Sequence, residues 1–421
     1  MIFRLCCILL FFCFLNSVDS QVYTEKQTRH RFAQMNFGFD LQSNIGGSTT
    51  FLNDANLLQT YEFGTSLVPR LLLGGTHFWG HADFYLAFPL GSGNYDFNNQ
   101  SAKVRRGVET VFKYYPLAIE QGKIRPYIGT SIAPFSFKQD NNNFDFAEGP
   151  ELNQTHFPLL AGLTYNKNNH LFELGAVYNY DGNQSYFISR TQTAEIEIPP
   201  LYLNLSYRYL IDTTLSAEDN WESGKTQQVT EVLAKEGGLN GFFIGAGISS
   251  AFWLEESDYN TTQRPYVAKN GIAVFPDFTL GYYLHKPDIN FAFAYRGYTS
   301  SSEAYGASQE FSRRSLLFET TKNLFDYQGF VPFIGPAISY ESLAFDERFE
   351  GTLTVEASDN KIAYGLTFGW DIRPNRIQSW TLRTNLRWFP NLSLDAGNSS
   401  VSFDNIEFNF IQLIVYPSRL F

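Results

Sequence analysis

The clearest pattern in the chain is the alternation in Ala82-Asp83-Phe84-Tyr85-Leu86-Ala87-Phe88-Pro89-Leu90, where even-numbered positions are apolar and odd-numbered positions are mixed. Such a period of two is typical of a strand whose faces meet different surroundings. The same pattern recurs in residues 201–208, 289–296 and 380–388. Each run lasts about ten residues, which is enough for a tilted strand to cross the hydrocarbon core of a bilayer.

The composition of the mixed, less apolar face of these strands distinguishes a membrane barrel from a soluble sheet. This face is rich in Gly, Ala, Ser, Thr and Asn with isolated charges, whereas the apolar face carries Phe, Leu, Tyr and Trp. In a transmembrane barrel the apolar face contacts lipid and the polar face lines the lumen. We therefore predict an all-β fold, a transmembrane antiparallel up-and-down β-barrel. A soluble β-sandwich or propeller is the alternative.

The overall composition excludes several other classes of protein. Of the 421 residues, 17% are charged and 17% are aromatic, so the chain does not have the composition of a disordered protein. It contains no run of 18 apolar residues, which argues against a helical membrane bundle. The net charge of −11 makes a nucleic-acid partner unexpected, because phosphate binding needs a basic surface.

The first twenty residues have the pattern of a secretory signal peptide. Arg4 provides the positive charge, residues 5–15 form a short apolar segment, and Ser20 precedes the predicted cleavage site. This segment contains all three cysteines of the chain, Cys6, Cys7 and Cys13. The mature chain is therefore expected to have no disulfide, no thiolate metal site and no cysteine nucleophile.

The chain also repeats itself at an offset of 205 to 208 residues. Residues 126–132 (PYIGTSI) match residues 332–338 (PFIGPAI), and Arg105-Arg106-Gly107 matches Arg313-Arg314-Ser315. We predict a tandem duplication. The predicted organisation is a signal peptide (1–20), a first eight-stranded repeat (21–211), a periplasmic linker (212–240) and a second eight-stranded repeat (241–421).

Alternation and turn residues predict sixteen strands, eight in each half, centred near Phe39, Leu71, Leu86, Val108, Ile128, Leu163, Leu174, Leu205, Ile244, Phe278, Phe291, Leu316, Ile334, Leu366, Leu382 and Leu413. Their connections alternate between short turns and longer polar loops, as in outer-membrane barrels. Both termini are then expected on the short-turn, periplasmic side.

The Pro-aromatic-Ile-Gly strands and the terminal Phe421 carry a resemblance to known proteins. Each half resembles the small eight-stranded outer-membrane barrel families (the OmpW/OmpX-like group), and the aromatic C-terminus resembles the assembly signal of bacterial outer-membrane proteins. The resemblance implies the outer membrane of a Gram-negative bacterium. It also implies the lipid bilayer, lipopolysaccharide and the outer-membrane assembly machinery as partners, the last through the C-terminal strand ending at Phe421.

Sixteen strands can close once or twice. The long linker and the many small inward residues favour two narrow barrels. A single closed sheet needs only one pair of edge strands to close it, and tandem barrels on one chain are rare among bacterial proteins. We favour a single barrel of about 16 strands, wide enough for water, with two tandem 8-stranded barrels as the alternative.

Inward parity selects charged residues as candidates for lining the lumen, where they would either set solute preference or pair with one another and fill the interior. These candidates are Asp40, Arg70, Arg105, Glu109, Lys113, Glu173, Arg208, Asp277, Arg296, Glu319, Arg383 and Arg387. Arg70 and Asp277 occupy equivalent positions of the two repeats, which suggests a binding or constriction role for the pair.

Tryptophans near the expected strand ends are candidates for an aromatic girdle at the headgroup level. They are Trp79, Trp253, Trp370, Trp380 and Trp388. His77 and His81 share one turn with Asp83 nearby, but no third metal ligand is evident, so we expect no metal site and no cofactor.

The favoured function is therefore a porin-like passive channel for small polar solutes. The alternative is a non-conducting structural or interaction barrel that docks partners through its loops or its periplasmic linker. An outer-membrane enzyme is a third possibility, but no motif or grouping selects catalytic residues, and we expect none.

Overall fold

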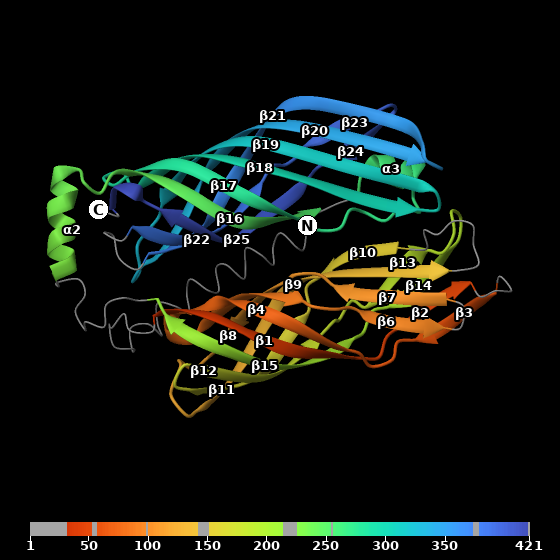
Figure 1. The fold of residues 1–421 in the computed structure, drawn as a ribbon, viewed down its shortest axis with the longest axis horizontal. Coiled ribbons are helices and arrows are strands. Elements are labelled where there is room, and N and C mark those ends of the chain that lie inside the picture. Colours follow the sequence, from red (N-terminus) through yellow and green to blue (C-terminus); the bar gives the residue numbers. More distant parts are fainter. Residues whose placement is uncertain are drawn as a thin grey trace.

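The computed structural model describes residues 32–52, 57–97, 100–141, 151–213, 225–253, 256–373 and 379–419. In this part of the chain, two antiparallel eight-stranded barrels lie side by side (Figure 1). The signal peptide expected at residues 1–20 lies outside the described residues, and so does Phe421. No helix among the described residues is long and apolar enough to span a bilayer.

The first barrel closes because β1 pairs with β15 and β9 pairs with β11. Phe39 of β1 lies opposite Tyr207 of β15. The eight strands of this barrel, within the described residues, are β1 (Ala33–Ile45), β4 (Leu67–His77), β5 (Ala82–Pro89), β8 (Glu109–Tyr114), β9 (Ile124–Asn141), β11 (Leu159–Lys167), β12 (His170–Tyr178) and β15 (Leu201–Asp212).

The second barrel closes between β16 and β25, where Ala246 lies opposite Leu413. Its eight strands, again within the described chain, are β16 (Gly241–Trp253), β17 (Ala273–Leu284), β18 (Ile289–Ala304), β19 (Ala307–Asn323), β20 (Phe330–Phe349), β21 (Thr352–Ile372), β22 (Trp380–Trp388) and β25 (Asn405–Val415).

These ladders confirm the predicted antiparallel barrel fold and correct its closure. The single barrel of about 16 strands that we favoured is wrong, and the alternative of two 8-stranded barrels is what the structure has. A single barrel would need β15 to pair with β16 and β25 to pair with β1, but the edge strands of each half pair with each other. Fifteen of the sixteen predicted strand centres fall inside barrel strands, and Val108 lies one residue before β8.

The two ends of the molecule differ in the length of their connections (Figure 1). At one end lie short turns, the short helical turn η1 (Phe78–Gly80), the helix α2 (Lys225–Glu236) between the barrels and the C-terminal turn η2 (Pro417–Arg419). We call the opposite end the long-loop end. Its added elements are β2 (Ser48–Leu52), β3 (Leu58–Glu62), β6 (Gly93–Phe97), β7 (Gln100–Arg106), β10 (Glu151–His156), β13 (Asn183–Phe187), β14 (Thr193–Glu197), α3 (Asp258–Gln263), β23 (Ser393–Ala396) and β24 (Ser399–Ser402).

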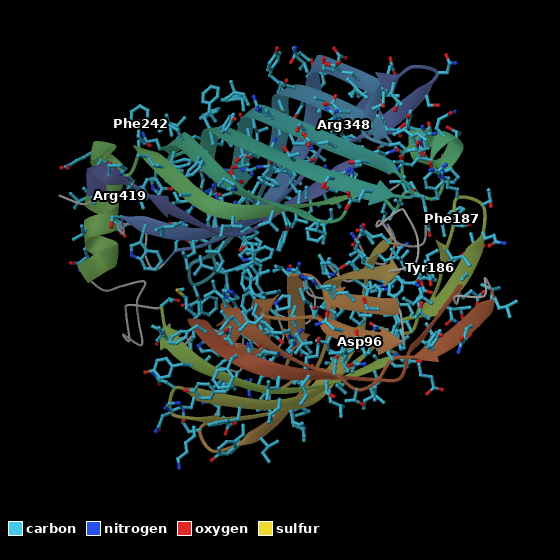
Figure 2. All side chains as sticks on the ribbon, turned by 45° about the vertical axis from the view of Figure 1, so that its right-hand side comes forward. Asp96, Tyr186, Phe187, Phe242, Arg348 and Arg419 are labelled. Carbon is cyan, nitrogen blue, oxygen red and sulfur yellow. The ribbon has the colours of Figure 1, made fainter. Side chains whose placement is uncertain are left out.

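The barrel surfaces are apolar, whereas the interiors hold the polar and charged side chains together with buried apolar clusters. Along β15 the exposed fraction is 4% for Asn204, 62% for Leu205 and 4% for Ser206. This order is the reverse of a soluble protein, because the large apolar side chain is the one left outside. Figure 2 shows the same arrangement on the second barrel, where Phe242 projects outward and is 67% exposed.

The outer faces of the barrels also pack against each other, and we call this contact surface the seam. In its middle, Phe84 and Phe112 of the first barrel pack with Phe408 and Phe410 of β25. Near the short turns, the ring centroids of Phe78 and Phe330 are 5.0 Å apart. At the long-loop end the seam becomes polar. There the Arg190 guanidinium donates to the Tyr305 carbonyl oxygen over 2.7 Å.

Candidate functional site

The interior of the first barrel contains an ion-pair cluster centred on Arg70 of β4. Its guanidinium donates to both carboxylate oxygens of Asp40 on β1, over 2.8 and 2.5 Å, and to Glu109 on β8 over 2.6 Å. Arg106 donates to the other oxygen of Glu109 over 2.9 Å. All four side chains are buried. Each guanidinium is therefore matched by a carboxylate, as burial of charge requires.

A second cluster lies nearer the short turns of the same barrel. Arg208 of β15 forms ion pairs with Asp83 of β5 at 2.7 Å and with Glu173 of β12 at 3.1 Å. Lys113 of β8 also contacts Glu173 and lies 4.7 Å from the ring centroid of Tyr85. Two strands separate β15 from β5, so the Arg208–Asp83 pair crosses the interior, whereas Arg208 and Glu173 lie on neighbouring strands.

The second barrel is filled in the same way. Arg313 of β19 makes two 2.8 Å hydrogen bonds to Glu341 and an ion pair of 3.1 Å with Glu407 of β25. In the closed order of this barrel, β19 and β25 are four strands apart by either route. The Arg313–Glu407 pair therefore spans the lumen. Arg387 of β22 bridges Asp277 of β17 and Glu319 in a similar arrangement.

The structure buries the predicted lumen residues with the exception of Arg105. Arg105 is exposed because the inward parity changes between β7 and β8, so that its neighbour Arg106 is the one that faces the Glu109 carboxylate. Arg383 pairs with Asp371 at 2.8 Å, and Arg296 lies beside Glu407. Arg70 and Asp277 do not meet, because each pairs within its own barrel. The structure therefore corrects the proposed constriction pair.

Several interior charges were missing from the sequence-based candidates. Asp83 shares the inward face of the 82–90 segment with Tyr85, so the alternation already carried that signal. Glu407 could not be found by alternation from Leu413, because the ladder between β16 and β25 shifts register between Ile248 and Ser249. This irregularity brings Glu407 onto the inward face. The other buried charged residues missed among the described residues are Arg106, Arg125, Arg313, Glu341, Glu347, Asp371 and Arg373.

The predicted aromatic girdle needs correction at three positions. Trp79 is only 9% exposed and packs in the seam, with its ring centroid 5.1 Å from that of Phe32. Trp253 is 8% exposed and packs against Tyr298. Trp370 contacts Phe84 across the seam, at 5.5 Å between ring centroids. Only Trp380 and Trp388 are half-buried on the outward face of β22, where a headgroup role stays a prediction.

The turn histidines do not share a ligand. His81 has its Nδ1 2.8 Å from the Tyr115 carbonyl oxygen. The His77 ring instead packs against Phe84, with 5.6 Å between the ring centroids. Among the described residues, no group of three His, Cys, Asp or Glu side chains is arranged to hold a metal ion.

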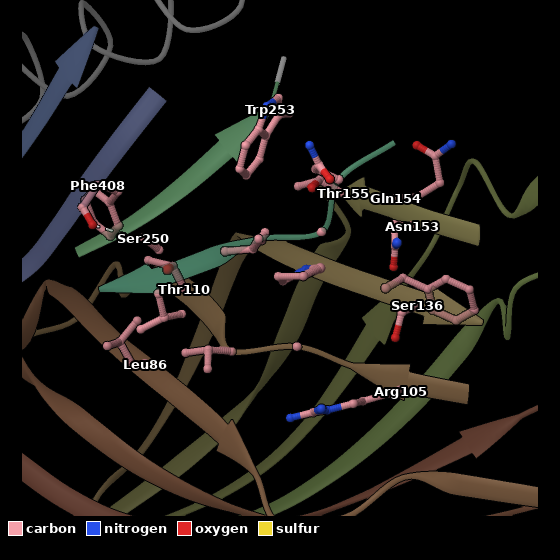
Figure 3. Close-up of a pocket in the computed structure, with 18 of the residues that line it drawn as sticks. Leu86, Arg105, Thr110, Ser136, Asn153, Gln154, Thr155, Ser250, Trp253 and Phe408 are labelled. Atoms are coloured by element: carbon pink, nitrogen blue, oxygen red, sulfur yellow. Dashed lines mark hydrogen bonds between the residues drawn. The ribbon is translucent and has the colours of Figure 1, made fainter. Parts of the chain in front are cut away.

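A cavity of about 290 Å³ lies in the seam, towards the long-loop end (Figure 3). Both barrels line it. The first contributes residues of β5, β9 and β10, and the second contributes residues of β16, β17 and β25. Figure 3 shows Leu86 and Arg105 on the side of the first barrel, with Ser250, Trp253 and Phe408 on the side of the second.

No protein-family model matches this chain, and no curated protein matches it either. Among solved structures, Neisserial surface protein A is similar at 15% identity and a TM-score of 0.29, over 42% of this chain and 97% of that one. An outer-membrane channel from Pseudomonas putida F1 is similar at 8% identity and a TM-score of 0.18, over 90% and 94%. A FadL homologue from Pseudomonas aeruginosa is similar at 10% identity and a TM-score of 0.18, over 91% and 89%. The assignment of two barrels rests on the strand ladders of this chain itself.

Proposed function

We propose that this chain is a structural or interaction protein of a bacterial outer membrane, whose two barrels do not conduct solutes. The observation that carries the proposal is the set of ion pairs that cross each interior, above all Arg313–Glu407 and Arg208–Asp83. An eight-stranded barrel is just wide enough for its own side chains to fill it. The paired charges occupy the space that permeating ions would need.

The same observation favours this proposal over the porin-like passive channel that the sequence suggested. A pore that selects ions needs charged side chains that are hydrated and free to face the solute. Here Arg70, Glu109, Arg387 and Glu319 are each at most 2% exposed, and each is paired with an opposite charge. Opening a path would separate such pairs in a medium of low dielectric, which is costly.

We propose that the barrels lie in a membrane because their outer surfaces expose large apolar side chains. Side chains such as Leu205, Leu280 and Tyr364 are more than half exposed. Soluble monomers rarely expose large contiguous apolar patches, whereas lipid-facing barrel strands do. Lipopolysaccharide, the assembly machinery acting through Phe421, periplasmic termini and a Gram-negative host are parts of the same proposal. We also propose that the chain has no enzymatic activity.

Planar-bilayer recording tests the absence of conductance directly. Purified full-length chain is reconstituted beside a known porin, and insertion is verified on the same samples by protection of the barrels from protease. We expect no single-channel steps from inserted protein, whereas the porin should give steps of the nanosiemens class. Steps of that size from the inserted chain would refute the proposal.

A further inference from the structure

The seam cavity has an apolar part and a polar part. Its apolar wall includes Leu86 and Phe88 of β5, Ile272 before β17, and Phe410 of β25. These belong to the outward faces of the barrels, the faces that elsewhere are left for lipid. At about 290 Å³, the cavity is at the lower end of ligand pockets, and it suits one slender apolar chain better than a whole lipid.

The cavity opens onto the lipid-facing surface of the second barrel. Ile248 and Val274 line it, and they are also 60% and 57% exposed. A flexible chain in the surrounding bilayer could therefore enter sideways, without crossing water. This geometry distinguishes the cavity from a pocket for a soluble ligand, which would open towards the aqueous ends of the barrels.

Cationic and hydrogen-bonding groups line the part of the cavity beyond the ends of the barrel strands. Arg105 and Lys269 are its cations. Lys269 also has the Glu256 carboxylate nearby, whereas no carboxylate among the described residues forms an ion pair with Arg105. Asn153 links the two barrels here, because its side-chain amide donates to the Lys269 carbonyl oxygen over 3.3 Å. Figure 3 shows Arg105, Asn153 and Thr155 on one side of the site. The cations suit an anion. The Asn153 amide already donates to the Glu151 carboxylate over 2.8 Å and to the Lys269 carbonyl oxygen, so the Gln154 amide and the Thr155 hydroxyl are the β10 donors left for the oxygen atoms of that anion.

We infer that the seam binds a phosphate-bearing anionic lipid of the surrounding leaflet. One acyl chain lies between the barrels against Ile272 and Phe410, and the phosphate headgroup is held by Arg105 and Lys269. The inference rests on the proposed membrane location and goes beyond it, because it names a site and a ligand class. It involves no step that depends on whether the barrels conduct.

Native mass spectrometry in detergent micelles tests the site, with phosphatidylglycerol as the probe and phosphatidylcholine as the zwitterionic comparison. We expect the full chain to retain one phosphatidylglycerol. Arg105→Gln combined with Lys269→Gln should weaken retention about tenfold or more, since each charged contact is lost. Arg314→Gln removes an exposed arginine outside the cavity and should leave retention unchanged. Val274→Trp should exclude the acyl chain while keeping both cations.

Three outcomes would overturn the inference. The first is equal retention of the two lipids, and the second is equal retention of phosphatidylglycerol by the native chain and the double variant. The third is that inorganic phosphate displaces phosphatidylglycerol while Val274→Trp retains phosphatidylglycerol as strongly as the native chain does. The last result would identify a plain anion site. Circular dichroism checks that each variant keeps its strands. Because the measurement uses micelles and no current, a conducting barrel would refute the proposed function and leave this test intact.

Discussion

The central feature at the scale of single residues is that charges which look suited to a pore are used to fill it. Arg70 illustrates this, because three hydrogen bonds tie its guanidinium to Asp40 and Glu109 with only 2% of the residue exposed. Removing one partner of such a cluster leaves the others buried without compensation. The interior charges should therefore matter to stability more than to any solute.

Arg70→Ala tests this reading. We expect it to lower the free energy of unfolding by about 3–5 kcal/mol, because Asp40 keeps its charge and loses its partner, while Glu109 is left with Arg106 alone as its cation. The measurement is guanidinium-induced unfolding in phospholipid vesicles, followed by tryptophan fluorescence.

The matched control is Lys123→Ala, which breaks the pair of Lys123 with Glu120 on the surface, where both side chains are more than half exposed. This change should cost less than about 1 kcal/mol. Equal effects of the two substitutions would show that the interior is hydrated and that the Arg70 cluster is not a sealed filling.

At this scale the sequence predicted most of the interior but not all of it. Alternation selected Arg70, Glu173 and Arg387 correctly as inward residues, because strand geometry fixes side-chain direction. It failed at Arg105, where the inward parity changes between β7 and β8, and at Glu407, beyond the register shift. Neither irregularity has a signature in the hydrophobic pattern, so alternation alone places both side chains on the wrong face.

Two kinds of outward face exist at the scale of strands. Phe410 on β25 and Phe278 on β17 are both outward aromatic residues, but Phe410 is 6% exposed in the seam and Phe278 is 56% exposed. The sequence cannot separate them, because a strand packed on another barrel and a strand packed on lipid both require large apolar side chains. The same ambiguity explains why Trp79 and Trp370 were assigned to a headgroup girdle.

Phe410→Ala is expected to lower the free energy of unfolding more than Phe278→Ala does. The first leaves a cavity between two barrels, which should lower the free energy of unfolding by about 3–5 kcal/mol. The second should cost clearly less, because mobile acyl chains can refill the space beside β17. The same unfolding assay in vesicles measures both. A cost for Phe410→Ala no greater than that for Phe278→Ala would mean that lipid, and not protein, covers β25.

For the whole molecule, the decisive property is which edge strands pair. The strand positions followed from the alternation, since the buried and exposed faces of each strand differ in composition. Closure did not follow, because β1, β15, β16 and β25 all carry the same pattern and any of them could pair with another. The structure resolves the choice through long ladders within each half, such as the one that joins residues 34–45 of β1 to β15.

Cross-strand disulfide formation measures this closure most directly. In the full chain with Cys6, Cys7 and Cys13 replaced by Ser, Phe39→Cys combined with Tyr207→Cys places two thiols on directly opposed residues of β1 and β15. We expect rapid disulfide formation in the folded protein, detected by blocked thiol alkylation. Phe39→Cys combined with Leu413→Cys, which joins β1 to β25, should stay reduced. The opposite outcome, with the second pair oxidised and the first reduced, would mean that the sixteen strands close as one barrel.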